Sequence, residues 1–185
     1  MSKLKKIALP FFVGAVAGGC SPYTPIKMEL HTLPSLHSYY QNKLVAGFHI
    51  DKVVDDRIDK TSLGMFADHP VLSKNFSTWV KNSFMQMQKT CHTNNCQALS
   101  IKVKIKKAYV ESEYDVINAN ILIDIYYYRN GKFINKIAYH GYDTSVNWAG
   151  SNNDYTRPLS NALKIILNKV ASDIKRLQGS VTPEL

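Results

Sequence analysis

The sequence predicts an α+β domain: an antiparallel sheet with two amphipathic helices on one face, in the order β-α-β-β-β-α. Residues 99–106 alternate between apolar and polar side chains, which is the period of a half-buried strand. Asn130-Gly131 separates two segments rich in β-branched and aromatic residues and is a strong hairpin signal. Apolar residues recur at helical spacing after Ser73 and again after Pro158, which predicts the two helices.

The N-terminal segment predicts export and a lipid anchor. Three lysines precede an apolar run, Ile7 to Ala17, that is shorter than the about 20 residues of a membrane-spanning helix. The sequence AGGC at 17–20 resembles the lipobox of bacterial lipoproteins. In that family a peptidase cleaves before the cysteine, whose sulfur carries diacylglycerol and whose new amine carries an acyl chain. We therefore expect 1–19 to be a signal peptide and Cys20 to be the anchor. The alternative is an ordinary secretory signal with a chance cysteine.

Charge and anchor together restrict the partners. The chain carries 23 Lys and Arg against 14 Asp and Glu, and without the three signal-peptide lysines its net charge is still +6. An exported basic protein meets phospholipid headgroups, lipopolysaccharide or acidic protein surfaces, so we expect no nucleic-acid partner. Buried acyl methylenes contribute about 0.8 kcal/mol each, which holds a protein at a membrane without a spanning helix. Ser21 is not the Asp that retains lipoproteins in the inner membrane, which favours the outer membrane with the domain facing the periplasm.

The remaining chain divides into a tether, one domain and a tail. Residues 20–43 contain three prolines and no sustained period, which predicts a tether behind the lipidated cysteine. A single α+β domain is expected over 44–179, followed by a C-terminal tail at 180–185. The domain opens with a strand within 44–57, and residues 56–66 are expected to form a loop.

The first helix is expected to begin near Ser73 or Asn75 and to end before a cysteine-containing loop. Its apolar face consists of Phe76, Trp79, Val80, Phe84 and Met87. In an oxidising compartment, Cys91 and Cys96 are expected to form a structural disulfide. A metal site with His92 and a redox-active pair are the alternatives. The spacing is not C-x-x-C, and there is no second pair to complete four zinc ligands.

The next strand, within 98–110, carries a candidate binding strip. Leu99, Ile101, Val103 and Ile105 alternate with polar residues, so one face belongs to the core. The candidate strip consists of Lys102, Lys104, Lys106 and Lys107. The alternative is a solvated face of solubilising lysines.

A hairpin and a long helix complete the domain. The strands are expected over 118–129 and 132–146, and a pairing of Arg129 with Lys132 places Ile125 opposite Lys136. This mismatch predicts a bulge or an edge position. About half of the aromatic side chains near the hairpin must point into the core, so the tyrosine triplet at 126–128 is weak evidence of a binding surface.

The last helix is expected to have Pro158 in its first turn and Gly179 at its end. Its apolar stripe consists of Leu159, Ala162, Leu163, Ile166, Val170, Ile174 and Leu177.

Enzyme signatures are absent from the sequence. There is no G-x-S-x-G, Walker A, G-x-G-x-x-G or H-E-x-x-H motif, and the six histidines are scattered. We therefore expect no enzyme activity, no catalytic residue, no metal and no cofactor other than the acyl groups on Cys20. Asp51, Asp55, Asp56 and Asp59 lie near Arg57. They favour a hydrogen-bonded turn over a calcium site, because EF-hand spacing is absent.

The lipobox, the strand ending VVDDRIDKTSLG and the terminal helix together resemble the YajG-type family of outer-membrane lipoproteins. In that family the first strand ends in a D-x-R turn, with a glycine several residues on. Asp55, Asp56, Arg57 and Gly64 match this turn, and the likeness covers 44–178. It implies an antiparallel sheet with two amphipathic helices and no catalytic activity. The same outline occurs in auxiliary lipoproteins of lipid-transport systems.

These features favour a non-enzymatic envelope lipoprotein whose periplasmic domain binds another envelope component, as a subunit of a secretion, motility or envelope-maintenance assembly. The second hypothesis is a lipid or glycolipid carrier that works with a transport system. A carrier would need an apolar groove between helix and sheet, with the lysine strip for anionic headgroups. A flat basic or aromatic patch would favour the first hypothesis.

Overall fold

The computed structural model describes residues 24–30, 47–66, 68–88, 99–113, 115–146 and 152–179. The elements in these ranges are β1 (Ile26–Lys27), β2 (Phe48–Asp55), β3 (Ser62–Phe66), β4 (His69–Leu72), α2 (Phe76–Met87), β5 (Leu99–Glu113), β6 (Val116–Arg129), β7 (Lys132–Val146) and α3 (Asn152–Gly179). No helix in this part of the chain has the length and apolar composition that a membrane crossing requires.

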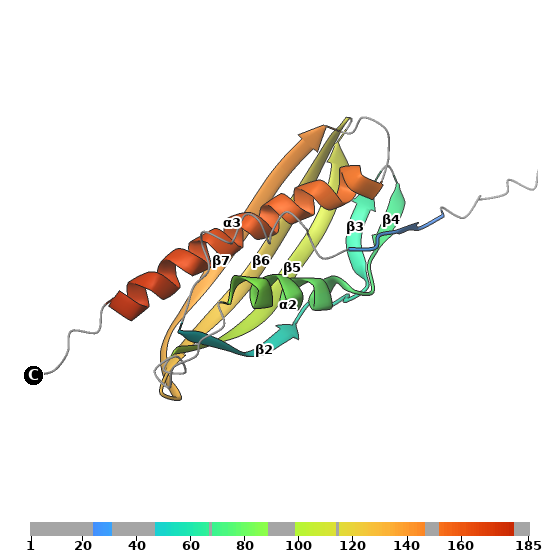
Figure 1. The fold of residues 1–185 in the computed structure, drawn as a ribbon. Helices are drawn as coiled ribbons and strands as arrows, with labels where there is room; N and C mark the ends of the chain where they lie inside the picture. Colours follow the sequence, from blue (N-terminus) through green and yellow to red (C-terminus); the bar gives the residue numbers. More distant parts are fainter. Residues whose placement is uncertain are drawn as a thin grey trace, which may run out of the picture.

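One mixed sheet with two helices on one face makes up the described fold, which confirms the predicted α+β class (Figure 1). β5, β6 and β7 form an antiparallel meander, as expected. β2 and β3, however, both pair parallel to β5, β2 along 99–105 and β3 at 110–111. The long connection from β2 through β3, β4 and α2 lets β5 start at the same end of the sheet as β2, which parallel pairing requires.

Residues 56–66 were expected to form a loop, but strand β3 occupies the second half of this segment. Gly64 has φ +99°, and a Cβ on it would lie 2.3 Å from the carbonyl oxygen of Val110. Only glycine lets the two backbones approach this closely, so a residue that is typical of loops here permits a strand. β4 pairs antiparallel with β3 and β1 pairs parallel with β4, and neither short strand was expected from the sequence.

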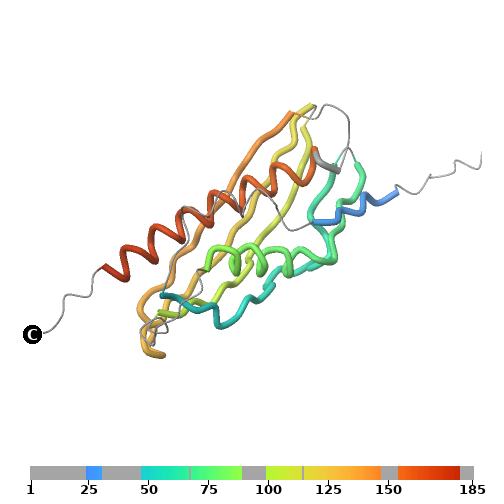
Figure 2. Tube along the Cα trace, viewed as in Figure 1, coloured from blue at the N-terminus to red at the C-terminus, as the bar shows by residue number. Residues whose placement is uncertain are grey.

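Residues 24–30, inside the expected tether, pack on the domain. The backbone N–H of Met28 donates to the Leu72 carbonyl at 2.7 Å, and the side chains of Met28 and Leu30 are buried. Asn75 precedes α2 without making a capping bond; its amide instead donates to the Leu30 carbonyl at 2.8 Å. The blue segment in Figure 2 runs beside β4 accordingly. We call residues 24–30 the strap.

α2 has the expected start and the expected buried face. α3 has its expected buried stripe and ends at Gly179, but it begins at Asn152, so Pro158 lies inside the helix rather than in its first turn. Tyr155 packs edge-on against Phe66, with ring centroids 4.6 Å apart. This packing stabilises the extra N-terminal turn, although Pro158 cannot donate a helical hydrogen bond.

α3 lies tightly on β7 and β6. A Cβ on Gly141 of β7 would lie 2.0 Å from the carbonyl oxygen of Ala162, so helix and strand are in backbone contact there. A buried hydrogen-bond chain joins the Tyr127 and Tyr139 hydroxyls at 2.5 Å, and Tyr139 donates to Asp173 of α3 at 2.6 Å. The two layers are therefore linked by polar as well as apolar contacts.

The hairpin confirms the predicted bulge. Arg129 pairs with Lys132, and the register shifts between Tyr127 and Tyr128, so Tyr126 rather than Ile125 lies opposite Lys136. The shift keeps the apolar residues of β6 on the helix side. β7 ends the strand order within the described part of the sheet, as an edge position predicts.

Candidate functional site: the open sheet face and its corner pocket

The side of β5, β6 and β7 opposite the helices is the open face. Because side chains alternate along a strand, the face that does not pack on α2 and α3 carries the polar set. Its members are Lys102, Lys104, Lys107, Tyr109 and Glu111 from β5, Asn118, Asn120, Leu122, Asp124 and Tyr126 from β6, and Lys136, Ala138, His140, Tyr142 and Thr144 from β7. A bulge between Ile105 and Lys107 exposes both Lys106 and Lys107.

Lysines on this face differ in how they are neutralised. Lys106 pairs with Asp56 at 2.6 Å and Lys136 with Asp124 at 2.7 Å, and each contact raises the pKa of its ammonium group. Lys102, Lys104 and Lys107 are not in ion-pair contact with any carboxylate that the structure describes. Along β5, the open face therefore carries three lysines that lie outside ion-pair contact with the described carboxylates, although Lys104 lies opposite Asp124 and helps to lower the pKa of Asp56.

Aromatic rings lie between these charges. The ammonium groups of Lys104 and Lys136 are 5.3 and 5.5 Å from the Tyr126 ring centroid, on the two strands that flank β6. Lys107 is 4.8 Å from the ring of Tyr109. Such contacts attract the lysines to the rings and hold them near the sheet, and for Lys104 and Lys107 they leave the charge in place.

The D-x-R turn is built around a buried ion pair. Arg57 donates from Nε and Nη2 to the two carboxylate oxygens of Asp55 at 2.9 and 2.8 Å, and both side chains are at most 10% exposed. Its remaining donors reach the carbonyl oxygens of Ser62 at 3.0 Å and Lys60 at 2.7 Å. The guanidinium also lies 4.7 Å from the ring centroid of Phe76 in α2. Arg57 thus ties the turn to the end of β2 and to the core.

Two exposed carboxylates complete the turn. Asp59 accepts the backbone N–H groups of Thr61 and Ser62 at 2.8 and 3.0 Å, and these bonds lower its pKa. The hydrogen bond from Lys106 lowers the pKa of Asp56. Between these residues, the side chain of Ile58 is fully exposed at 107%.

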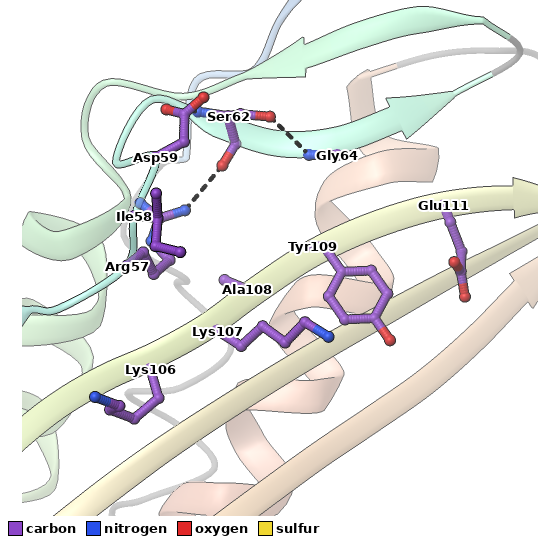
Figure 3. Close-up of a pocket in the computed structure, with 10 residues that line it drawn as sticks. All are labelled: Arg57, Ile58, Asp59, Ser62, Gly64, Lys106, Lys107, Ala108, Tyr109 and Glu111. Carbon is purple, nitrogen blue, oxygen red and sulfur yellow. Dashed lines mark hydrogen bonds between the residues drawn. The ribbon is translucent and has the colours of Figure 1, made fainter.

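A pocket of about 640 Å³ joins the turn to the lysine strip (Figure 3). Its lining consists of Arg57, Ile58, Asp59, Ser62, Gly64, Lys106, Lys107, Ala108, Tyr109 and Glu111. β2 stops pairing with β5 at Ile105 and β3 resumes at Val110. Between these two points, the edge of β5 that faces β2 and β3 has no strand partner within the described residues. The pocket lies along this unpaired stretch. The structure thus brings together two residue sets that lie about 50 positions apart in the sequence.

The other half of the open face carries uncharged polar side chains and the carboxylate of Glu111, which lies opposite Asn118. Asn118 accepts hydrogen bonds from Tyr142 at 3.0 Å and Thr144 at 2.9 Å. His140 and Asn120 are 3.0 Å apart. The Asn118, Asn120, His140, Tyr142 and Thr144 side chains thus hydrogen-bond to one another, and the Tyr142 ring is exposed beside them.

Ser100, His49 and Asp51 lie close together, but they do not form a nucleophile–base pair. Ser100 donates to Asp51 at 2.9 Å, and His49 lies 3.8 Å from the same carboxylate. The serine and the histidine thus each contact the aspartate and not one another. Nucleophilic catalysis requires a hydrogen bond between the general base and the nucleophile.

The four aspartates do not converge on a cation site. Asp51 accepts from Ser100, Asp55 from Arg57, Asp56 from Lys106, and Asp59 from the turn backbone. Within the described ranges, no group of three or more His, Cys, Asp or Glu side chains is placed to hold a metal ion. The contacts match the hydrogen-bonded turn that the sequence favoured.

Other predicted sites lie outside the described residues: Cys20 with its acyl groups, and the Cys91–Cys96 disulfide. Sequence reasoning missed the cluster of Asp124, Tyr126 and Lys136. The signal was the mismatch of Ile125 with Lys136, which a one-residue bulge converts into Tyr126 opposite Lys136. It also missed the exposure of Ile58, since one apolar residue in a turn carries no periodicity.

Comparisons with known proteins identify the fold but no family. No family model matches this chain, and no curated protein matches it. It is similar to a solved structure from Xanthomonas campestris assigned to family DUF330, with TM-score 0.52 and 8% identity, covering 85% of this chain and 95% of that one. At this identity the likeness concerns the fold alone.

Two further solved structures share less with this chain, and both are described as lipoproteins. One, from Caulobacter crescentus, has a TM-score of 0.41 and 8% identity, covering 57% of this chain and 84% of its own. The other, a minor lipoprotein from Acinetobacter baumannii, has a TM-score of 0.29 and 11% identity, covering 72% and 90%. Membership of the YajG-type family stays a prediction from the sequence.

Proposed function

We propose that this chain is a non-enzymatic lipoprotein of the bacterial envelope, anchored in the outer membrane through acylated Cys20, whose domain binds an acidic surface of another envelope protein. The open face is the docking surface, and its role is structural or in assembly. The observation that carries the proposal is the row of three lysines, Lys102, Lys104 and Lys107, that lie outside ion-pair contact with the described carboxylates. The lipobox at 17–20 supports the anchor.

Charge complementarity is the physical basis of this assignment. Alternate residues on a strand lie about 7 Å apart, so the lysines repel one another and carboxylates of a partner would relieve that repulsion. Complementary charge accelerates encounter and sets orientation. The face is a broad sheet surface rather than an enclosed cavity, which suits a macromolecule better than a small ligand.

The carrier hypothesis has less support. It requires an apolar groove between helix and sheet. In the described part of the interface, side chains such as Ile121, Ile123, Leu163 and Ile166 are fully buried against one another. These side chains fill the space between the layers that a lipid chain would need.

Photo-crosslinking from the open face tests the docking surface. A photoreactive residue at Ala138, which is exposed on β7 opposite Asp124, is compared in cells with the same residue at Ile165 on the outer side of α3. We expect position 138 to yield one dominant protein adduct, with an acidic crosslinked peptide identified by mass spectrometry. Equal adducts from both positions, or adducts with lipid alone, would contradict a protein partner at this face.

Cys20→Ser tests the anchor separately. We expect this variant to lose labelling by fatty acid and to leave the membrane fraction, because the acyl chains supply the membrane affinity. Persistent membrane attachment of Cys20→Ser would contradict the assignment of Cys20.

A further inference from the structure

The strap restricts how far the domain can move from the lipid anchor. The Thr24 carbonyl oxygen is 2.9 Å from Nδ1 of His69, and Ile26 and Lys27 pair with Val71 and Leu72 of β4. The chain therefore contacts the domain already at residue 24, within the segment expected to be a tether up to residue 43. Four residues reach about 14 Å when fully extended, which is the maximal distance from Cys20 to the strap.

The strap is held firmly enough to act as a fixed attachment. Met28 and Leu30 are 2% and 4% exposed, and Asn75 binds the Leu30 backbone through its side-chain amide. Burial of one such side chain favours the packed state by roughly 10-fold to 100-fold. Detachment of the strap, which would lengthen the connection to the rest of the domain, is correspondingly rare.

We infer that this short connection orients the domain, with the β1–β4 edge as its membrane-proximal surface and the β6–β7 hairpin turned away from the lipid. The inference rests on the proposed anchor at Cys20. β3 joins β5 at Val110, near the β5–β6 turn, whereas Leu99 and Arg129 mark the opposite end of the sheet. The 14 residues of β6 span about 45 Å, so the hairpin tip lies far from the anchored end.

In the alternative arrangement, the open face lies flat on the membrane. Glu111 and Glu113 of β5 and Asp115 in the following turn are exposed at the anchored end of the sheet. In a flat arrangement, anionic headgroups would repel these carboxylates but attract the lysines of the same face, so the short connection to Cys20, and not charge, carries the inference. The upright arrangement leaves the lysines of the open face accessible to a partner.

Fluorescence quenching on vesicles tests the orientation. The full lipidated chain is bound to vesicles of phosphatidylethanolamine and phosphatidylglycerol that contain a headgroup quencher. A dye is attached through an unnatural amino acid at Lys27 in β1 or at Lys132 in the hairpin; both positions are exposed and carry the same native residue. We expect several-fold stronger quenching at position 27 than at position 132.

A linker variant is the matched control. A long Gly-Ser segment inserted after Ser21 leaves the strap and the anchor unchanged but removes the length restriction, so the difference between the two positions should disappear. Equal quenching in the native chain, stronger quenching at position 132, or a difference that survives the linker would overturn the orientation. Failure of the lipidated chain to bind vesicles would instead overturn the anchor assignment.

Discussion

At the residue scale, the contacts of Arg57 explain why the D-x-R turn requires an arginine. Its planar guanidinium reaches both oxygens of Asp55 and two turn carbonyls at once, which the single ammonium group of a lysine cannot do. Both partners are buried, so each depends on the other for the neutralisation of its charge.

Arg57→Met tests this dependence. Removing the guanidinium leaves the Asp55 carboxylate buried and two carbonyls unpaired, which should cost about 3 kcal/mol or more of the free energy of unfolding. The double variant Asp55→Asn/Arg57→Met removes the orphaned charge and should regain part of that loss. Urea unfolding measures both; a double variant less stable than Arg57→Met would contradict the account.

Gly64→Ala tests the close approach of β3 to β5. The new Cβ would collide with the Val110 carbonyl, and alanine is strained at φ +99°, so a loss of about 2 kcal/mol or more is expected. Gly131→Ala is the matched control, because Gly131 also has positive φ but has open space around it. Denaturant midpoints should fall clearly more for position 64; equal losses would show that strain alone, and not the contact, matters there.

At the element scale, periodicity predicted the regular elements and failed for the irregular ones. β5, the hairpin, α2 and the buried stripe of α3 lie where alternation and helical spacing placed them, because each buries one repeating face. β3 and β1 are short, and their pairing depends on Gly64 and on the Asn75 contact with Leu30. Those contacts are long-range, so no local pattern indicates them. The early start of α3 likewise depends on Tyr155 meeting Phe66.

The polar link between sheet and α3 predicts a pH dependence. Burial, together with the hydrogen bond to Asp173, raises the pKa of Tyr139, and burial raises that of Tyr127. Unfolded tyrosines lose their protons near pH 10, so above that pH the unfolded state binds fewer protons than the native state. The free energy of unfolding should therefore fall as pH rises, by up to about 1.4 kcal/mol per pH unit for each tyrosine.

Tyr139→Phe isolates this contribution. Urea unfolding from about pH 9 to 11 should show a shallower decline in Tyr139→Phe than in the native chain, because one proton difference is removed. Tyr142→Phe is the control, since Tyr142 is 48% exposed on the open face. An unchanged slope in Tyr139→Phe would contradict the role of the buried chain.

At the scale of the whole molecule, the two faces of the sheet carry different kinds of side chain. The helices bury one face, and the other carries three lysines outside ion-pair contact with described carboxylates, beside a pocket that the turn helps to form. The sequence indicated the lysine row and the turn separately. The sequence could not predict that the two lie side by side. Their proximity depends on the parallel pairing of β2 with β5 and on the bulge before Lys107. The role of Cys20 remains a prediction from the sequence.

Charge reversal on the open face tests the central claim most directly. Lys102, Lys104 and Lys107 are replaced together by Glu, and in a second variant by Gln, which avoids new repulsion with Asp124. The control replaces Lys81, Lys164 and Lys175 on the helices by Glu, with an identical change in net charge. Native-like circular dichroism is required of each variant, and the crosslink from position 138 to its identified partner is then quantified in cells. We predict that the open-face Glu variant loses the crosslink, that the Gln variant weakens it and that the control retains it. Equal crosslinking by the open-face and control Glu variants would contradict the claim.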